Sequence, residues 1–142
     1  LQENKELLKY NYIFSLMSIH NSFQNNISIN NLFDGLNKHS LVGTKIIVSF
    51  LDKEILFQNK DTLYLPEGSF MSKKSNELLY YFSWRHKKPL KEPLISFTDL
   101  EKNFKKHDWS LQKLYRNNLF VAQENQWIDV ERSLSIAIFE KI

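Results

Sequence analysis

The sequence contains no cysteine, and its 142 residues include only three glycines and three prolines. Without cysteine the chain forms no disulfide and no thiolate metal site. Its four histidines (His20, His39, His86 and His107) have no metal-ligand spacing, so we expect no metal centre and no other cofactor. The most apolar stretch, residues 10–19, is far shorter than the roughly 20 residues of a membrane span, and we expect no membrane association.

Recognisable catalytic motifs are also missing. The few glycines form no phosphate-binding loop or Gly-x-Ser-x-Gly turn, and no cysteine nucleophile exists. Asp52 and Glu54 lie on either side of Lys53, where we expect a solvated helix face rather than an acid–base pair. The sequence therefore indicates a noncatalytic protein.

The charge of the chain is unevenly distributed. Lysine and asparagine, with A/T-rich codons, are abundant, so the net charge of +3 is in part a codon effect. Residues 1–70 carry a net charge of −1, however, and residues 71–142 carry +4. A charged partner is therefore expected on the second half. The first residue is Leu1 and acidic residues follow it, which indicates an internal segment of a longer intracellular protein rather than a signal peptide.

An internal similarity links two stretches of the chain. Residues 27–39 and 95–107 align at a constant offset of 68 residues and share five identities. The identical pairs are Ile27/Ile95, Ser28/Ser96, Leu32/Leu100, Lys38/Lys106 and His39/His107. Weaker matches continue on both sides, so we predict two copies of one unit, at residues 1–68 and 72–142.

Each copy is predicted to begin with a helix. Apolar residues recur at helical spacing from Leu7 in the first copy and from Leu78 in the second. A short β segment follows, and then a second helix whose N-cap is Asn30 or Asn31 in one copy and Thr98 or Asp99 in the other. His39 and His107 then lie at helix C-termini, where an imidazole suits the helix dipole.

The third helices are predicted at residues 41–56 and 108–118. Residues 44–51 are rich in β-branched side chains and by themselves favour a strand, but their alignment with the second copy favours a helix, which we adopt. Two short alternating stretches close each copy. The polar turns at residues 58–61 and 123–126 are the predicted hairpin tips.

This order of elements resembles a tandem pair of winged-helix domains, a mainly α fold with small β-hairpins, and residues 111–127 look like a third helix that continues into a wing. Tandem winged helices also occur in transcription and membrane-sorting subunits. In size the chain is most similar to the C-terminal region of the middle subunit of the telomere-capping CST complex, a replication protein A middle-subunit-like protein. The resemblance implies a nuclear interaction module that recruits polymerase α–primase or telomerase components, with possible contact to single-stranded or duplex DNA. The alternative is a duplex-DNA-binding transcription or replication-initiation factor.

The candidate nucleic-acid or partner-binding site lies in the second copy. Cations beside aromatic side chains can contact phosphates and stack on bases. A solvated surface around core aromatic residues is the alternative interpretation of the same pattern. The candidate residues are Lys87, Lys88, Lys105, Lys106, Trp109, Gln112, Lys113, Arg116 and Asn117.

Overall fold

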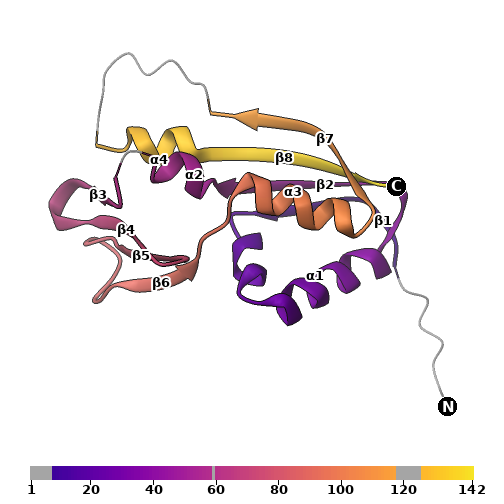
Figure 1. The fold of residues 1–142 in the computed structure, drawn as a ribbon, viewed down its shortest axis with the longest axis horizontal. Coiled ribbons are helices and arrows are strands. Elements are labelled where there is room, and N and C mark those ends of the chain that lie inside the picture. The colour runs from indigo at the N-terminus through magenta and orange to yellow at the C-terminus, as the bar shows by residue number, and fades with distance from the viewer. Residues whose placement is uncertain (1–7, 59, 118–125) are drawn as a thin grey trace.

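The computed structural model describes residues 8–58, 60–117 and 126–142, which form eight strands in two four-stranded sheets (Figure 1). The mixed sheet has the strand order β1-β2-β8-β7, and the meander sheet has the order β3-β4-β5-β6. The chain builds half of the mixed sheet, then the whole meander sheet, and then returns to complete the mixed sheet.

The mixed sheet combines a parallel and two antiparallel pairs. Its strands span Tyr10–Leu16 (β1), Ser40–Leu51 (β2), Leu134–Lys141 (β8) and Trp109–Arg116 (β7). β1 pairs parallel with β2, whereas β8 runs antiparallel to both of its neighbours. A parallel pair needs a crossover connection, and the α-helix α1, Asn26–Lys38, supplies it after a short 3-10 helix, η1, at Ile19–Phe23.

Two capped helices cover one face of the mixed sheet. The Asn25 side chain accepts a hydrogen bond from the Ser28 N–H at the start of α1. Ser96 does the same for the Asp99 N–H at the start of α3, Phe97–Lys106. The predicted location of His39 and His107 at helix C-termini is confirmed, since they are the C-cap residues of α1 and α3.

Aromatic side chains join these helices to each other and to the sheet. The Phe33 ring meets the Phe104 ring edge-on at 4.9 Å between centroids, and Phe104 stacks on Phe139 at 4.0 Å. All three phenylalanines are fully buried. Burial of such large apolar surfaces is the dominant favourable contribution to folding, so this cluster anchors α1, α3 and the mixed sheet as one body.

The meander sheet packs through a second hydrophobic cluster. Its strands are Thr62–Tyr64 (β3), Phe70–Lys74 (β4), Glu77–Tyr81 (β5) and Leu90–Pro93 (β6), with a 3-10 turn, η2, at Pro66–Gly68. Met71 and Leu78 are buried in this cluster with Leu56 of α2. Two short helices, α2 (Lys53–Leu56) and α4 (Ile128–Ser133), contribute side chains to it and lie between the sheets.

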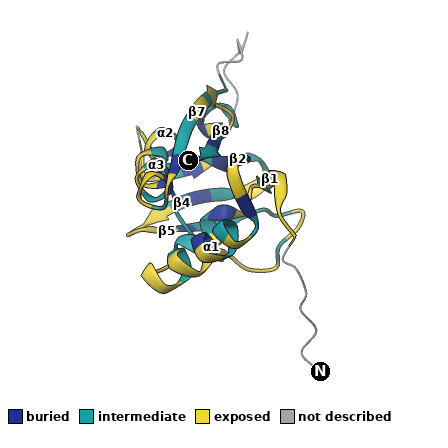
Figure 2. Ribbon diagram, turned by 90° about the vertical axis from the view of Figure 1, so that its right-hand side faces the viewer, coloured by how far each residue is buried: buried dark blue, intermediate teal, exposed yellow. Residues whose placement is uncertain are grey.

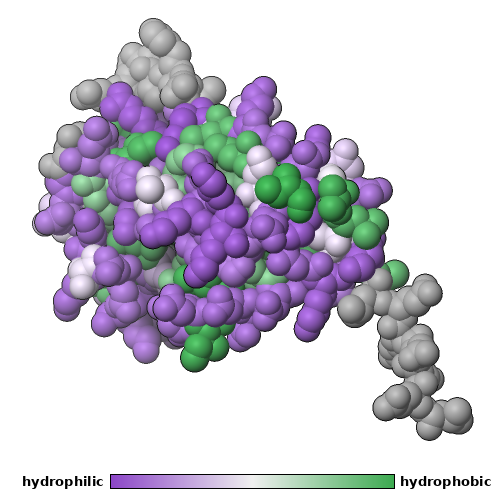
Figure 3. Space-filling model, turned by 45° about the vertical axis from the view of Figure 1, so that its right-hand side comes forward, coloured by the Kyte–Doolittle hydropathy of each residue, from purple (hydrophilic) through white to green (hydrophobic). Residues whose placement is uncertain are grey.

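On the face of the molecule that Figure 3 shows, hydrophilic side chains predominate and hydrophobic ones form smaller separate patches. Among the described residues, no helix is long and apolar enough to span a membrane.

The predicted winged-helix fold is wrong. The chain is a mixed α/β structure, and the predicted helices that begin at Leu7 and Leu78 are the strands β1 and β5. Most of residues 41–56 forms β2, and residues 109–116 form β7. The physical reason is burial on the sheet: β2 contributes Ile46, Val48 and Phe50 to the core through alternate positions, which is strand periodicity.

The predicted hairpin tips are not supported as wings. The first falls around residue 59 and the second on residues 123–126, and both lie partly outside the described residues. The β2–β8 pairing joins strands from both sides of the boundary predicted between residues 68 and 72. That boundary stays a prediction, without the winged-helix domains that it was meant to separate.

We predict that His107 makes stability depend on pH. Its ring stacks on Phe33 at 4.3 Å between centroids, and among the described residues its buried Nε2 has no hydrogen-bond partner. Burial, with a smaller contribution from Lys106, lowers the His107 pKa below its ordinary value of 6.5. The unfolded chain therefore binds more protons than the folded one just below that value, and the free energy of unfolding falls as the solution is acidified.

Urea unfolding between about pH 7.5 and about pH 5.5 measures this effect. We expect His107→Phe, which keeps a stacking ring, to lose less stability on acidification than the wild type. His39→Phe, at the equivalent end of the other helix, serves as the control. An unchanged pH slope in His107→Phe contradicts the prediction.

Candidate functional site

A pocket lies between the two sheets, where the two parallel strands end. Its volume is about 580 Å³. Met17 follows β1 directly, and Leu51 is the last residue of β2. The meander sheet covers these strand ends from the other side. The lining residues are Met17, His20, Leu51, Leu56, Met71, Leu78, Tyr80, Phe82, Arg85, His86, Leu90, Glu92, Pro93, Leu94 and Ile95. We call this cavity the inter-sheet pocket.

The turn after β1 brings His20 to the pocket. Met17 adopts a left-handed backbone conformation with φ of 54°, and its N–H donates to both the backbone and the side-chain oxygen of Ser49 at 3.0 Å. These bonds tie the end of β1 to β2. The chain then enters η1, which carries His20. The chain therefore turns at Met17, directly after β1, and His20 lies at the pocket.

Three polar side chains form a hydrogen-bonded group in the pocket. The Glu92 carboxylate lies 2.9 Å from His20 Nε2 through one oxygen and accepts a hydrogen bond from the Tyr80 hydroxyl at 2.9 Å through the other. The His20 and Glu92 side chains are 15% and 33% exposed, so the group is screened from water without being closed to it. His20 comes from the mixed-sheet side, and Tyr80 and Glu92 come from the meander sheet.

Tyr80 stays protonated in this environment. Burial raises its pKa above the ordinary value of 10.0, and the hydrogen bond to Glu92 raises it further, while Arg85 acts in the opposite direction. A neutral phenol can donate one hydrogen bond. Tyr80 therefore holds one carboxylate oxygen of Glu92, and the other oxygen fixes the ring orientation of His20.

Aromatic rings line the meander side of the pocket. Phe82 stacks on Trp84 at 5.1 Å and on His86 at 5.5 Å between centroids, and Tyr80 meets His86 edge-on at 5.4 Å. The Phe82 N–H donates to His86 Nδ1 at 3.0 Å, which makes that nitrogen an acceptor. A mostly apolar wall with a few converging polar groups is the usual composition of a small-molecule site.

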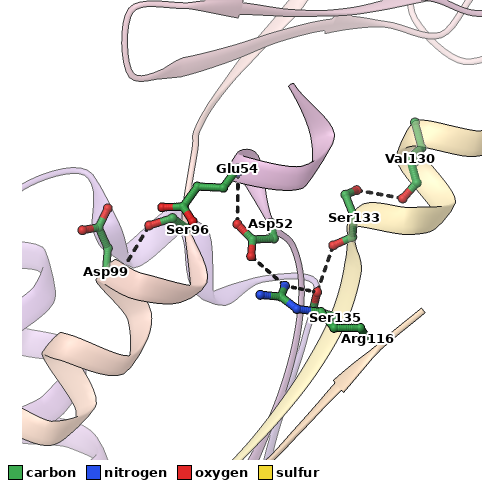
Figure 4. A network of polar contacts seen from close by, with 8 residues as sticks. All are labelled: Asp52, Glu54, Ser96, Asp99, Arg116, Val130, Ser133 and Ser135. Atoms are coloured by element: carbon green, nitrogen blue, oxygen red, sulfur yellow. Dashed lines mark hydrogen bonds and ion pairs between the residues drawn. The ribbon is translucent and has the colours of Figure 1, made fainter. Parts of the chain in front are cut away.

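A buried ion pair holds the end of β2 beside the pocket (Figure 4). Asp52 is fully buried, and its carboxylate lies 2.6 Å from Arg116 Nη1 of β7. Arg116 also donates to Ser135 Oγ of β8 at 2.8 Å, and the Glu54 N–H donates to the other Asp52 oxygen. The Asp52 N–H bonds to the Ser133 carbonyl at 2.9 Å. Asp52 and Arg116 together thus join the end of β2 to α2, β7 and β8.

The residues predicted to bind nucleic acid or a partner do not line this pocket. Lys87 and Lys88 are exposed between β5 and β6, and Lys105 and Lys106 are exposed in the last turn of α3. Their predicted role stays a prediction, and the structure does not gather them with the others into one surface. Gln112 and Lys113 are exposed on β7.

Three of the predicted binding residues instead make contacts within the fold. Trp109 has no exposed surface, and its Nε1–H donates to Asn37 Oδ1 at 3.0 Å. Arg116 points to Asp52, and Asn117 donates through its side-chain nitrogen to the Glu131 carbonyl at 2.7 Å. The expected solvated face at Asp52 is also wrong, because this carboxylate is buried.

The pocket residues were not identifiable from the sequence. His20 and Glu92 are 72 residues apart, and they come from the 3-10 helix η1 and from strand β6. The one available signal was the proline-bounded segment that contains Glu92, which is extended as its prolines require. In the described parts of the chain, no group of three or more histidine and carboxylate side chains could hold a metal ion.

Comparisons with known proteins identify the fold. The sequence matches no protein-family model and no curated protein. Solved structures of S-adenosylmethionine-dependent methyltransferases are similar to it. They include CcbJ from Streptomyces caelestis (TM-score 0.64, 8% identity, covering 99% of this chain and 64% of that one). Enzymes from Methanosarcina mazei (TM-score 0.63, 9% identity, 99% and 63%) and Clostridium acetobutylicum (TM-score 0.59, 13% identity, 99% and 61%) also match.

These likenesses show the fold and correct the earlier interpretation. The chain has the fold found in these Rossmann-like methyltransferases, not that of winged-helix proteins such as the CST subunit. The predicted noncatalytic interaction module, telomeric or DNA-binding, is therefore contradicted, because the structures that share this fold are enzymes. The partners and the nuclear location stay untested predictions, and the resemblance from which they were drawn is wrong. The chain spans between 55% and 65% of the length of eight of the structures that it matches.

We predict that Arg116 contributes mainly to stability. Replacing it by methionine in Arg116→Met leaves the Asp52 carboxylate buried without its counter-ion, which costs about 3 kcal/mol of unfolding free energy, the lower end for buried pairs because Arg116 is partly exposed. Urea unfolding measures the loss. Arg132→Met, at an exposed arginine of α4, is the matched control.

The double variant Asp52→Asn/Arg116→Met should recover part of this loss, because a neutral amide can still accept the Glu54 N–H bond without a buried charge. Equal stability of Arg116→Met and Arg132→Met is the result that contradicts a structural role for the pair.

Proposed function

We propose that this chain forms the acceptor-binding part of an S-adenosylmethionine-dependent methyltransferase. The observation that carries the proposal is the position of the inter-sheet pocket at the carboxyl ends of the parallel strands β1 and β2. In open α/β sheets, ligands bind outside the carboxyl ends of the strands. The likeness to methyltransferase structures supports a methyl acceptor as the ligand of this pocket.

The pocket suits a small, mainly apolar acceptor with one hydroxyl or amino group. A volume of about 580 Å³ lies within the usual range for small-molecule sites. Leu56, Met71 and Leu78 offer an apolar floor, and the Phe82 ring offers a flat surface. His20, held by Glu92, is the group placed to accept a hydrogen bond from the acceptor, and Glu92 orients it.

The described residues do not fit the methyl donor itself. An α/β nucleoside site uses glycines at a strand-to-helix turn and an acidic side chain for the ribose hydroxyls. Gly35 lies within α1, Gly43 within β2 and Gly68 in the η2 turn between β3 and β4, so no glycine directly follows β1 or β2. The first carboxylate after β2, Asp52, is already bound by Arg116. The proposal for this chain is therefore acceptor binding.

Small phenols and amines test acceptor binding. We expect 4-ethylphenol and tyramine to shift the amide NMR signals of pocket residues such as Met71 and Leu78. Glu92→Gln removes the carboxylate charge and should weaken tyramine binding by about tenfold, since hydrogen bonds to charged groups are stronger. Binding of 4-ethylphenol should change less.

Glu77→Gln is the matched control, because Glu77 lies exposed on the neighbouring β5 and does not line the inter-sheet pocket. Signals that shift away from the pocket, or tyramine affinity that is equal in Glu92→Gln and Glu77→Gln, contradict the proposed site.

Methyl transfer by the natural gene product tests the function as a whole. With tritiated S-adenosylmethionine and a small-molecule extract, we expect label in a small organic product. His20→Ala should lower the rate by about a hundredfold, the scale of a positioned base, while His39→Ala, at the C-cap of α1 and outside the pocket, should not. Transfer of label that is insensitive to His20→Ala contradicts the role of the pocket, and absence of any labelled product contradicts the function.

A further inference from the structure

The inter-sheet pocket contains an arginine in addition to the group formed by His20, Tyr80 and Glu92. Arg85 lies in the connection between β5 and β6 and lines the pocket. The residue is exposed, so its side chain lies where the pocket meets solvent. Among the described residues its guanidinium forms no ion pair and no hydrogen bond. A guanidinium carries five N–H donors, and these donors are therefore free to bind a ligand.

The turn that carries Arg85 is fixed by hydrogen bonds. The Phe82 carbonyl accepts from the Arg85 N–H at 3.0 Å and from the His86 N–H at 2.8 Å. In return the Phe82 N–H donates to His86 Nδ1. The Ser83 N–H donates at 3.0 Å to Oγ of Ser69, a buried residue directly before β4. The turn is therefore closed on itself and tied to the meander sheet.

Aromatic contacts also hold the residues on both sides of Arg85. Its two neighbours in the sequence, Trp84 and His86, each stack on the Phe82 ring. Residues 78–81 of β5, which lead into this turn, are buried or half-buried (Figure 2). A group that a fixed backbone presents loses less conformational freedom on binding, which favours affinity. Arg85 is thus preorganised at the pocket.

The charges of the pocket leave Arg85 without a counter-ion. Glu92 is the only carboxylate among the described lining residues. One of its oxygens lies 2.9 Å from His20 Nε2, and the other accepts from the Tyr80 hydroxyl. Both oxygens are therefore engaged with other groups. The cation at the pocket mouth is left to be paired by a negatively charged group of a ligand.

The connection between β5 and β6 adds to the positive charge at this place. Residues 82–91 contain Arg85, Lys87, Lys88 and Lys91 and no aspartate or glutamate. Lys87 and Lys88 are exposed and are not among the lining residues. A surface of one charge sign raises the local concentration of ligands of the opposite sign and speeds their association. The mouth of the inter-sheet pocket therefore attracts anions.

We propose that the acceptor is a small organic acid whose carboxylate binds Arg85 while its hydroxyl or amino group meets His20. This inference rests on the proposed function and adds the substrate class to it. A planar guanidinium binds a carboxylate through two parallel N–H···O bonds. The apolar side chains of Leu56, Met71 and Leu78 line the same pocket and suit the carbon skeleton that joins the two polar groups.

A carboxylate fits this pocket better than a phosphate group. Among the described lining residues, Arg85 is the only lysine or arginine, and one guanidinium balances one negative charge. A phosphate group carries about two negative charges near neutral pH. Its second charge would have no counter-ion in the pocket and would be repelled by Glu92. The carboxylate, with a single charge, is therefore the group that the pocket accepts.

Four matched ligands test the carboxylate in calorimetric titrations of the natural gene product. They are 3-(4-hydroxyphenyl)propionate, its neutral amide, 4-ethylphenol and 2-(4-hydroxyphenyl)ethylphosphonate. We expect the propionate to bind about tenfold more tightly than the amide or 4-ethylphenol, because charge-assisted hydrogen bonds are stronger than neutral ones. Equal affinities of the propionate and its amide overturn the inference. Failure of the propionate to bind overturns it too, as does tighter binding of the phosphonate.

Substitutions of Arg85 assign the preference to this side chain. Arg85→Gln should abolish the preference for the propionate and leave 4-ethylphenol binding unchanged, because it removes the charge and keeps a polar side chain. Arg85→Lys, which keeps the charge without the planar fork, should retain part of the preference. Lys87→Gln is the matched control, since it removes a positive charge from the same connection outside the pocket. An equal loss of preference in Arg85→Gln and Lys87→Gln overturns the assignment to Arg85.

The charge of the labelled product separates this inference from the proposed function. In the tritium assay, a methylated acid that keeps its carboxylate is retained on an anion-exchange column at neutral pH. If label appears only in neutral or cationic products, the carboxylate site is overturned and the methyltransferase function stands. If the propionate binds in an Arg85-dependent manner but no labelled product forms, the carboxylate site is supported and the function is overturned.

Discussion

The ion pair between Asp52 and Arg116 is the interaction on which the rest of the structure depends. Asp52 directly follows the long central strand β2, is the N-cap of α2 and is fully buried, so its charge requires a partner. Arg116 supplies that partner from β7 and also binds β8 through Ser135. The next residue, Lys53, bonds through its N–H to the Ile95 carbonyl ahead of α3. The contacts of Asp52 and Lys53 therefore connect β2 to β7 and to the segment before α3. The inter-sheet pocket lies beside these contacts.

The pocket is a product of two sheets with different roles. The mixed sheet supplies parallel strand ends and His20, while the meander sheet supplies an apolar wall and the pair Tyr80 and Glu92. The hydrogen bonds that Glu92 shares with both sides couple the meander sheet to the mixed sheet. In the same mixed sheet β1 is an edge strand, and its carboxyl end borders the pocket.

The internal similarity was a correct observation with a wrong interpretation. Residues 27–39 and 95–107 do form equivalent elements, since each is a helix that ends at a histidine C-cap and leads into a strand. The shared pattern is thus one helix-to-strand unit used twice in a single α/β fold, and not a duplicated three-helix domain. At residues 44–51 the local preference of β-branched side chains for a strand was right, and the alignment that replaced it with a helix was wrong.

The sequence by itself determined the features that act over a few residues. It excluded disulfides, and it indicated the two amphipathic helices and their histidine ends, because apolar periodicity operates within one or two turns. The predicted N-caps were wrong, since the caps are Asn25 and Ser96. The tertiary structure alone decided which strands pair, that Trp109 and Arg116 turn inward, and that His20 meets Glu92 from 72 residues away. Those outcomes depend on burial and charge pairing between distant segments, and these contacts exist only once the sheets have assembled.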